Sequence, residues 1–194
     1  SHYEGKNMIQ RYTSKDIAPI WSDENKYDIW LKIELFACEA QSKLGLIPSE
    51  ALETIQKKAN FNVSRILEIE ETVKHDVIAF LTNLEEYIGE PARFIHYGMT
   101  SSDVLDTCFA YQCKQAGEII LMKLEKFKDV LAKRAIEFKH TVCIGRTHGI
   151  HAEPTTFGLK LGLWFEECKR NIARMRAAIK QVSVGKINGA VGTF

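Results

Sequence analysis

The segment GRTHGIHAEPTT places two imidazoles, His148 and His151, shortly before the carboxylate of Glu153. Imidazole can transfer a proton near neutral pH, and it can also ligate a metal ion. A zinc site is disfavoured, because the chain has neither an HExxH nor a CxxC motif. Gly149 and Pro154 also argue against a regular helix that would align the two rings. We therefore predict no metal here.

An acid–base site fits this segment better. Thr147, His148 and Gly149 are expected to form a tight loop between two long helices, with Arg146 beside it to attract an anion. A histidine in that position could protonate a departing nitrogen or oxygen. The alternative is a histidine that simply packs in the turn, which competes strongly for His151 and more weakly for His148.

A run of hydroxyl side chains lies earlier in the chain, in the segment HYGMTSSDVLDT. Thr100, Ser101 and Ser102 precede Asp103, which could cap a helix beginning at Val104. A helix N-terminus lined with hydroxyl groups can also bind a carboxylate or a phosphate. The residues alone leave both interpretations open.

A third polar cluster, TVKHD, contains a cation, an imidazole and a carboxylate in succession: Lys74, His75 and Asp76. Neighbouring residues on a helix do not share a face, so the three side chains could not all reach one ligand atom there. From the residues alone, a solvated charge run is the favoured interpretation.

The elements that must position these clusters are helical. Apolar residues recur at helical spacing between four widely separated prolines, and no strand-length alternation flanked by hairpin turns is found, so the sequence predicts an all-α protein. Helices are expected over residues 23–40, 49–59, 62–71, 77–88 and 104–138, with a last one from Pro154 onward. This last helix carries a heptad seam of Leu161, Phe165, Cys168, Ile172, Met175, Ile179 and Val182.

The domain organisation follows from this change in helix length. Residues 8–118 are expected to form a small helical domain, and residues 119–194 the first long helices of a central antiparallel bundle. Two helices cannot enclose the seam, so we expect either a truncated chain or a homo-oligomer to cover it. Residues 1–7, SHYEGKN, are interpreted as a cloning remnant before a natural start at Met8, which leaves His2 without a role.

Composition excludes several classes of protein. The chain has 194 residues, 45% hydrophobic and 26% charged, with a net charge of +1, which gives no electrostatic case for nucleic-acid or membrane partners. Five cysteines without CxxC spacing favour buried free thiols and a cytoplasmic location over a disulfide framework.

Taken together, the clusters identify a resemblance. RYTSKDI (11–17), TVKHDVIAF (72–80), HYGMTSSDVLDT (96–107), GRTHGIHAEPTTFGLK (145–160) and GAVGTF (189–194) resemble, in this order, segments of the fumarase/aspartase superfamily of lyases. The similarity is greatest to a branch that acts on succinylated purine nucleotides and their precursors. A carboxymuconate cycloisomerase-like protein is the nearest alternative within the superfamily, and a non-catalytic helical scaffold is an alternative outside it.

The resemblance implies a β-elimination that releases fumarate, without a cofactor, in a homotetramer whose active sites combine segments of three subunits. It implies His148 as general acid and His75 as a second catalytic residue. It also implies substrate-binding positions at Arg11, Tyr12, Lys74, His75, Asp76, His96, Thr100, Ser101 and Thr147. The base of the superfamily is a serine on a glycine- and serine-rich loop. No such segment occurs in these 194 residues, so we expect the chain alone to be inactive.

Overall fold

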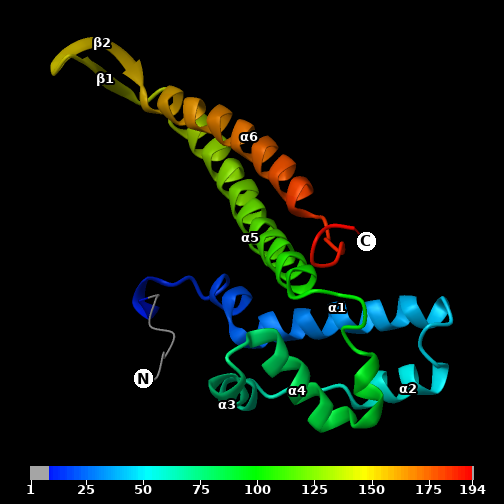
Figure 1. Cartoon of the computed structure of the whole chain (residues 1–194). Helices are drawn as coiled ribbons and strands as arrows, with labels where there is room; N and C mark the ends of the chain where they lie inside the picture. The colour runs from blue at the N-terminus through cyan, green and yellow to red at the C-terminus, as the bar shows by residue number, and fades with distance from the viewer. Residues whose placement is uncertain (1–8, 194) are drawn as a thin grey trace. The chain divides into compact units, whose positions relative to one another are not determined.

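The computed structural model describes residues 9–193, so the predictions about residues 1–7 and Met8 lie outside the described part. Its elements are almost all helical, which confirms the all-α fold class (Figure 1). In chain order they are η1 (Gln10–Tyr12), η2 (Ala18–Trp21), α1 (Asp23–Lys43), α2 (Ser49–Lys58), α3 (Val63–Val73), α4 (Asp76–Ile88), η3 (Glu90–Phe94), α5 (Ser101–Glu137), β1 (Val142–Thr147), β2 (Ile150–Thr156) and α6 (Phe157–Val182).

The helices begin and end at residues whose chemistry explains the boundary. The side chains of Ser22 and Asn62 accept the backbone N–H groups that the first turns of α1 and α3 leave unpaired. Helix α1 ends where Gly45 adopts a positive φ of 77°, as expected for a glycine just beyond a helix. The N–H of Leu46 then donates to the carbonyl oxygen of Gln41 at 2.9 Å and closes the end of the helix.

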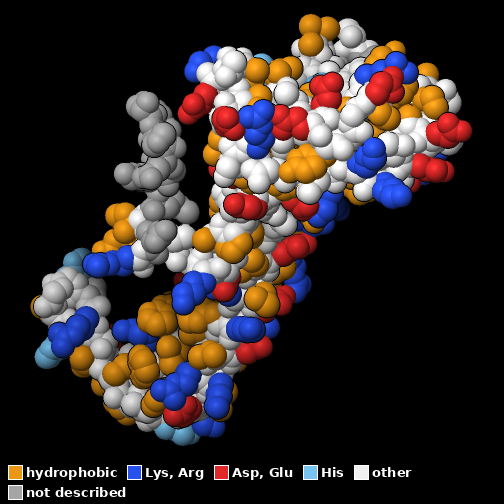
Figure 2. Space-filling view, turned by 90° about the horizontal axis from the view of Figure 1, so that it is seen from below, with side chains coloured by type: hydrophobic (Ala, Val, Ile, Leu, Met, Phe, Trp, Pro, Cys, Tyr) orange, Lys and Arg blue, Asp and Glu red, His pale blue; other side chains and the backbone are white. Residues whose placement is uncertain are grey.

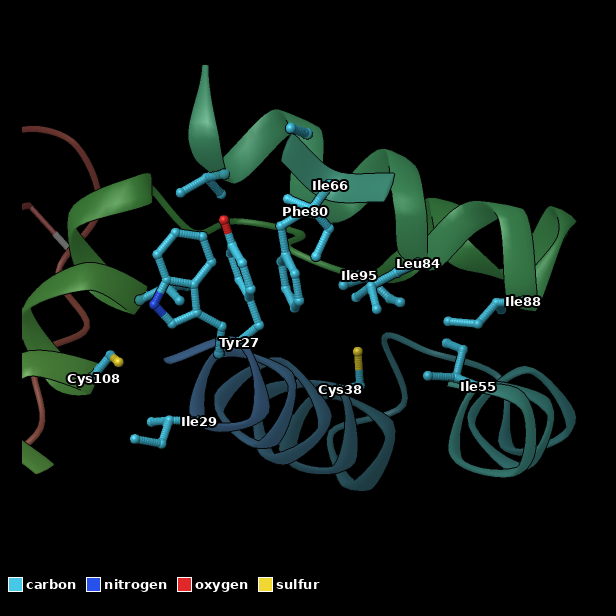
Figure 3. Packing of buried hydrophobic residues seen from close by; sticks show 14 of the residues in the cluster. Tyr27, Ile29, Cys38, Ile55, Ile66, Phe80, Leu84, Ile88, Ile95 and Cys108 are labelled. Atoms are coloured by element: carbon cyan, nitrogen blue, oxygen red, sulfur yellow. The ribbon is translucent and has the colours of Figure 1, made fainter. Parts of the chain in front are cut away.

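The first compact unit comprises the described residues up to Gln112 together with those from Val184 onward. Its core is an aromatic cluster in which Tyr27 stacks on Phe80 with ring centroids 5.7 Å apart (Figure 3). Trp30 meets both rings edge-on. Phe36 of α1 is exposed, whereas Glu34 and Cys38 of the same helix are buried.

The end of the chain returns to the start of α5, which was not expected. The side chain of Thr107 accepts the N–H of Lys186 at 2.9 Å and donates to its carbonyl oxygen at 3.1 Å. Asp103 accepts the N–H groups of Asn188 and Gly189. These bonds lie within the first compact unit and join its last segment to α5. The division into domains at residues 118 and 119 stays a prediction.

The second unit, Cys113–Ser183, contains the heptad seam. Leu161, Cys168 and Ile172 are buried with Leu131 of α5, and the other seam residues are partly buried, which confirms the predicted seam. Large apolar side chains remain exposed on both helices and lie among charged ones on the surface of the molecule (Figure 2). They include Phe127, Val130, Leu159, Leu163 and Trp164. Among residues 9–193, no helix is long and apolar enough to cross a membrane.

A β-hairpin stands where the sequence predicted only a loop between the two long helices. Strands β1 and β2 pair antiparallel, with Thr147 opposite Ile150. Pro154 was expected to open the last helix, but it lies in β2 opposite Ile144, and α6 begins at Phe157. The reason is local: the side chain of Thr156 caps α6 by accepting the N–H of Leu159.

Candidate functional site

Backbone conformation singles out the same three clusters that the sequence did. Among residues 9–193, three residues other than glycine have a positive φ: Lys74 at 54°, His96 at 64° and His148 at 50°. Each lies in a different cluster. Such conformations are costly for side chains with a Cβ, and they persist where the surroundings determine them, often at functional sites. This observation is independent of the sequence motifs and points to the same residues.

The KHD cluster spans the turn between α3 and α4. Lys74 caps the C-terminus of α3, and its N–H donates to the carbonyl oxygen of Glu70 at 2.8 Å. His75 is the N-cap of α4, and Asp76 is the first residue of that helix. The argument that helical neighbours point apart therefore does not apply here. All three side chains remain accessible to solvent.

The cap contact fixes the chemistry of the His75 ring. Its Nδ1 accepts the N–H of Ile78 at 3.2 Å. A backbone N–H can only donate, so Nδ1 carries no proton in this arrangement and the neutral ring holds its proton on Nε2. His75 therefore offers an N–H donor to a ligand from the nitrogen that points away from its own backbone contact.

The hydroxyl cluster lies in a short loop that leads into α5. His96 begins a turn in which the N–H of Met99 donates to its carbonyl oxygen at 3.2 Å. Thr100 follows, and Ser101 is the first residue of α5. The partly buried side chains of Thr100 and Ser101 thus stand at the N-terminus of a 37-residue helix, a position that favours an anion.

The sequence suggested that Asp103 caps a helix beginning at Val104, but α5 begins three residues earlier, at Ser101, so Asp103 lies inside its first turn. It is fully buried and accepts the N–H of Thr100 at 3.0 Å. Burial alone would raise the pKa of this carboxyl, but hydrogen bonds from the Thr100, Asn188 and Gly189 amides and from Lys186 outweigh burial and hold its pKa below the usual range. Asp103 therefore remains a charged acceptor that joins the loop to the end of the chain.

Glu34 is a candidate site residue that the sequence analysis missed. It is buried in α1, and its carboxylate contacts His96 through both oxygens. The sequence offered one signal: Glu34 lies four residues from both Trp30 and Cys38, on the helix face that these buried residues share. This spacing indicates a buried charge, but it does not identify the partner, which lies 62 residues away.

The third cluster occupies the tip of the β-hairpin. Thr147 ends β1, and His148 and Gly149 form the two-residue turn, both with positive φ. This geometry is that of the turn that closes tight hairpins. His148 is exposed at the tip, and His151 follows on β2 opposite Arg146. The predicted tight loop is thus confirmed at these residues, with strands on either side of it.

Arg11 and Tyr12 lie in the short helix η1 near the start of the described residues. Both side chains are exposed, Tyr12 by 76%. The N–H of Tyr12 donates to the carbonyl oxygen of Ile9 at 2.8 Å, which closes the turn. Nothing in the described contacts orders these two side chains toward the other predicted residues.

The predicted residues divide between the two compact units. Arg11, Tyr12 and the clusters around His75 and His96 belong to the first unit, and the hairpin tip to the second. Within the described part of the first unit, no hydrogen bond or ion pair joins the cluster around His75 to the cluster around His96. Cavities of about 340, 360 and 190 Å³ are lined by other residues. In the same range, no three His, Cys, Asp or Glu side chains gather as metal ligands would.

Comparison with known proteins assigns the chain to a family. The family described as "Lyase" matches residues 10–194. Adenylosuccinate lyases of Bacillus subtilis (strain 168) and of Staphylococcus saprophyticus are each 51% identical to this chain over 187 residues. Each alignment covers 96% of this chain and 43% of the relative's length. The chain therefore spans less than half the length of these curated relatives.

Solved structures give the same assignment. A fumarate lyase from Mesorhizobium sp. BNC1 matches 91% of this chain with a TM-score of 0.86 and 28% identity, over 43% of its own length. A β-carboxy-cis,cis-muconate cycloisomerase from Acinetobacter calcoaceticus matches 93% with a TM-score of 0.83 and 28% identity, over 44% of its length. Sequence family, relatives and fold agree: the chain belongs to the lyase family of the fumarase/aspartase superfamily.

Proposed function

We propose that the protein is an adenylosuccinate lyase. It would eliminate fumarate from adenylosuccinate to give AMP, and from the succinylated aminoimidazole carboxamide ribotide to give the carboxamide ribotide. The observation that carries this proposal is the 51% identity to two adenylosuccinate lyases across 96% of the chain. The structural neighbours are more distant, at 28% identity.

The proposed reaction needs an acid at the leaving nitrogen. A base removes a proton from the carbon beside a succinyl carboxylate, and the electron pair moves toward that carboxylate before the C–N bond breaks. The amine leaves poorly unless it is protonated. His148 is the proposed general acid, because an exposed imidazole at the tip of a hairpin can enter a neighbouring site, and Thr147 beside it is a proposed substrate contact.

The first unit supplies the proposed anion-binding groups. Thr100 and Ser101 at the N-terminus of α5 would hold a succinyl carboxylate, where negative charge grows in the transition state. His75 would donate from Nε2 to the substrate, with Lys74 and Asp76 beside it. His96 would contact the substrate from the same loop as Thr100, and Arg11 and Tyr12 would bind the nucleotide.

We also propose a homotetramer whose active sites are shared between subunits, since the exposed apolar faces of α5 and α6 need a cover. Such sharing would let His148 of one subunit meet the first unit of another. Nucleotides are the proposed partners, with no nucleic acid, membrane or cofactor involved. The free cysteines support a cytoplasmic location.

A muconate cycloisomerase activity is the second candidate, because proteins of that kind share the fold with TM-scores of 0.83 and 0.85. The lower sequence identity to these structures, 28% and 26%, makes it the weaker candidate. A non-catalytic helical scaffold would explain the fold but not the three positive-φ residues at the motif positions.

Ultraviolet absorbance distinguishes these candidates. Full-length protein is incubated with adenylosuccinate and, separately, with a carboxymuconate, and the loss or gain of conjugation is followed. Turnover of adenylosuccinate alone is the expected result. Turnover of the muconate alone would establish the second candidate, and turnover of neither substrate would favour the scaffold.

A further inference from the structure

Both carboxylate oxygens of Glu34 contact the same residue, His96. Its carboxylate is 1% exposed, and an ionised carboxylate so deeply buried needs strong partners. Oε2 accepts the backbone N–H of His96 at 2.9 Å, and Oε1 lies 2.6 Å from Nδ1 of the same histidine. Both contacts are within the first compact unit, and they reach across 62 residues of chain.

With Glu34 ionised, these two contacts select one tautomer of the His96 ring. An ionised carboxylate is only an acceptor, so Nδ1 must carry the proton between it and Oε1. The ring then presents Nε2 away from Glu34, and no residue within 9–193 hydrogen-bonds that nitrogen. The side chain is 17% exposed, so Nε2 is the ring atom left for a ligand. In this respect His96 is the reverse of His75, whose Nδ1 is an acceptor.

A neutral amide would suffice to hold the backbone N–H of His96 alone. Elsewhere in the same unit, neutral amides hold the backbone: buried Gln112 donates to the carbonyl oxygen of Ile20, and buried Asn83 accepts the N–H of Asn62. An amide offers one acceptor and one donor atom, and so it cannot accept from both the N–H and Nδ1–H of His96. A carboxylate can.

We propose that Glu34 is a positioning residue that fixes the tautomer and orientation of His96, so that Nε2 of His96 meets the substrate. This inference rests on the proposed function for the role of His96. The strained φ of 64° at His96 supports it, because the bond from its backbone N–H to Glu34 helps to hold a conformation that histidine otherwise avoids.

The variant Glu34→Gln tests the tautomer directly. The backbone N–H of His96 remains a donor and will bond to the amide oxygen of the new glutamine, so the glutamine NH₂ faces Nδ1 of His96. Nδ1 must then accept a hydrogen bond, and the ring proton moves to Nε2. Glu39→Gln is the matched control, because Glu39 lies on the same helix and, among the described residues, forms a single ion pair, with Lys43 at 3.4 Å.

Magic-angle-spinning NMR of full-length protein with ¹⁵N-labelled histidine rings reads the outcome, and His96→Ala assigns the signal. We expect a protonated Nδ1 in the unmodified protein and in Glu39→Gln, and a protonated Nε2 with a bare Nδ1 in Glu34→Gln. A bare Nδ1 in the unmodified protein would overturn the proposal, even if Glu34→Gln does not fold. This readout needs no lyase substrate, so it stands apart from a failure of the proposed function.

Kinetics then separates positioning from general stability. Glu34→Gln should lower kcat/KM for adenylosuccinate by about 10- to 100-fold, by analogy with the partners that orient metal-ligating imidazoles. In a His96→Ala background the same change should alter kcat/KM by less than about twofold, because its effect passes through the missing ring. Equal losses in both backgrounds, or no loss in a folded Glu34→Gln protein, would contradict the proposal.

Discussion

The carboxylate of Asp103 accepts the N–H of Thr100 at 3.0 Å and thereby holds the first residue of the hydroxyl pair at the N-terminus of α5. The same carboxylate lies 3.2 Å from the ammonium group of Lys186 and accepts two further backbone N–H groups from the end of the chain. One buried side chain therefore joins a proposed anion-binding loop to a segment more than 80 residues away.

Asp103→Asn should destabilise the protein strongly. Asparagine keeps the shape, but in either orientation its NH₂ group faces backbone N–H donors and leaves at least one of them unpaired, at a cost of roughly 1–3 kcal/mol each. Urea denaturation at neutral pH measures the loss. Asp106→Asn is the control, because Asp106 is 63% exposed and lies 3.8 Å from the same lysine. Equal stability losses in the two variants would contradict the assignment.

The stabilisation by Asp103 should also depend on pH. Its pKa in the folded protein is below the ordinary value of 3.8, so its contribution is complete above that value and is lost as the pH falls through the lower, folded value. The difference in unfolding free energy between the unmodified protein and Asp103→Asn should be constant from pH 7 to about 5 and shrink in stronger acid. A difference that grows on acidification would reverse the sign and refute the claim.

His148→Asn should abolish most of the lyase activity without unfolding the hairpin. Asparagine tolerates the positive φ at this position better than alanine does, but it cannot protonate the leaving nitrogen. We expect kcat to fall by about 10²- to 10⁴-fold with an unchanged unfolding midpoint. His151→Asn, on the same hairpin, should retain activity. A His148→Asn enzyme with normal kcat would remove His148 from its proposed role.

Two variants of His75 separate its role as the N-cap of α4 from its proposed role as a donor to the substrate. Asparagine is a good N-cap and alanine is not, so His75→Asn should preserve stability while His75→Ala loses about 0.5–2 kcal/mol. Both variants remove the Nε2–H donor and should lose activity to a similar extent. Thermal unfolding and kcat/KM, measured side by side, check this. Full activity in His75→Asn would show that the ring serves only as a cap.

Two glycines in α6 should respond oppositely to alanine. At Gly158 an added Cβ would lie 2.4 Å from the carbonyl oxygen of Ala135 and 2.6 Å from the backbone nitrogen of Lys139, so neither neighbour can yield easily. At Gly162 nothing lies within 4 Å. Gly158→Ala should unfold or severely destabilise the protein, whereas Gly162→Ala should stabilise it by about 0.4–1 kcal/mol. Denaturation midpoints of the two variants provide the measurement.

Periodicity predicted the helices because it is a local property of the sequence. The seam from Leu161 to Val182 repeats every seven residues, and Gly45 ends α1 as its backbone freedom suggests. The hairpin was missed because its turn uses His148 where hairpins usually use asparagine or aspartate before glycine. Strand signals in its short, largely exposed segments were correspondingly weak.

The parts of the site that sequence could not predict are the long-range ones. The contacts of Glu34 with His96 and of Asp103 with Asn188 join residues 62 and 85 positions apart. Spacing could have placed Glu34 on the helix face of Trp30 and Cys38, but only the folded chain shows which donors Glu34 and Asp103 meet. The positive φ values at Lys74, His96 and His148 likewise arise from tertiary context, since none of these residues prefers that conformation.

The length of the β1–β2 hairpin determines how far the His148 imidazole lies from the long helices, and this distance can change only by whole residues. Adding one residue to each strand would lengthen the arm by about 3.3 Å and turn the tip to the opposite face, because side chains alternate along a strand. Adding two to each would restore the facing but carry the ring about 7 Å too far. On the proposed role of His148, the length of this arm is therefore more constrained than the identity of the strand residues away from its tip.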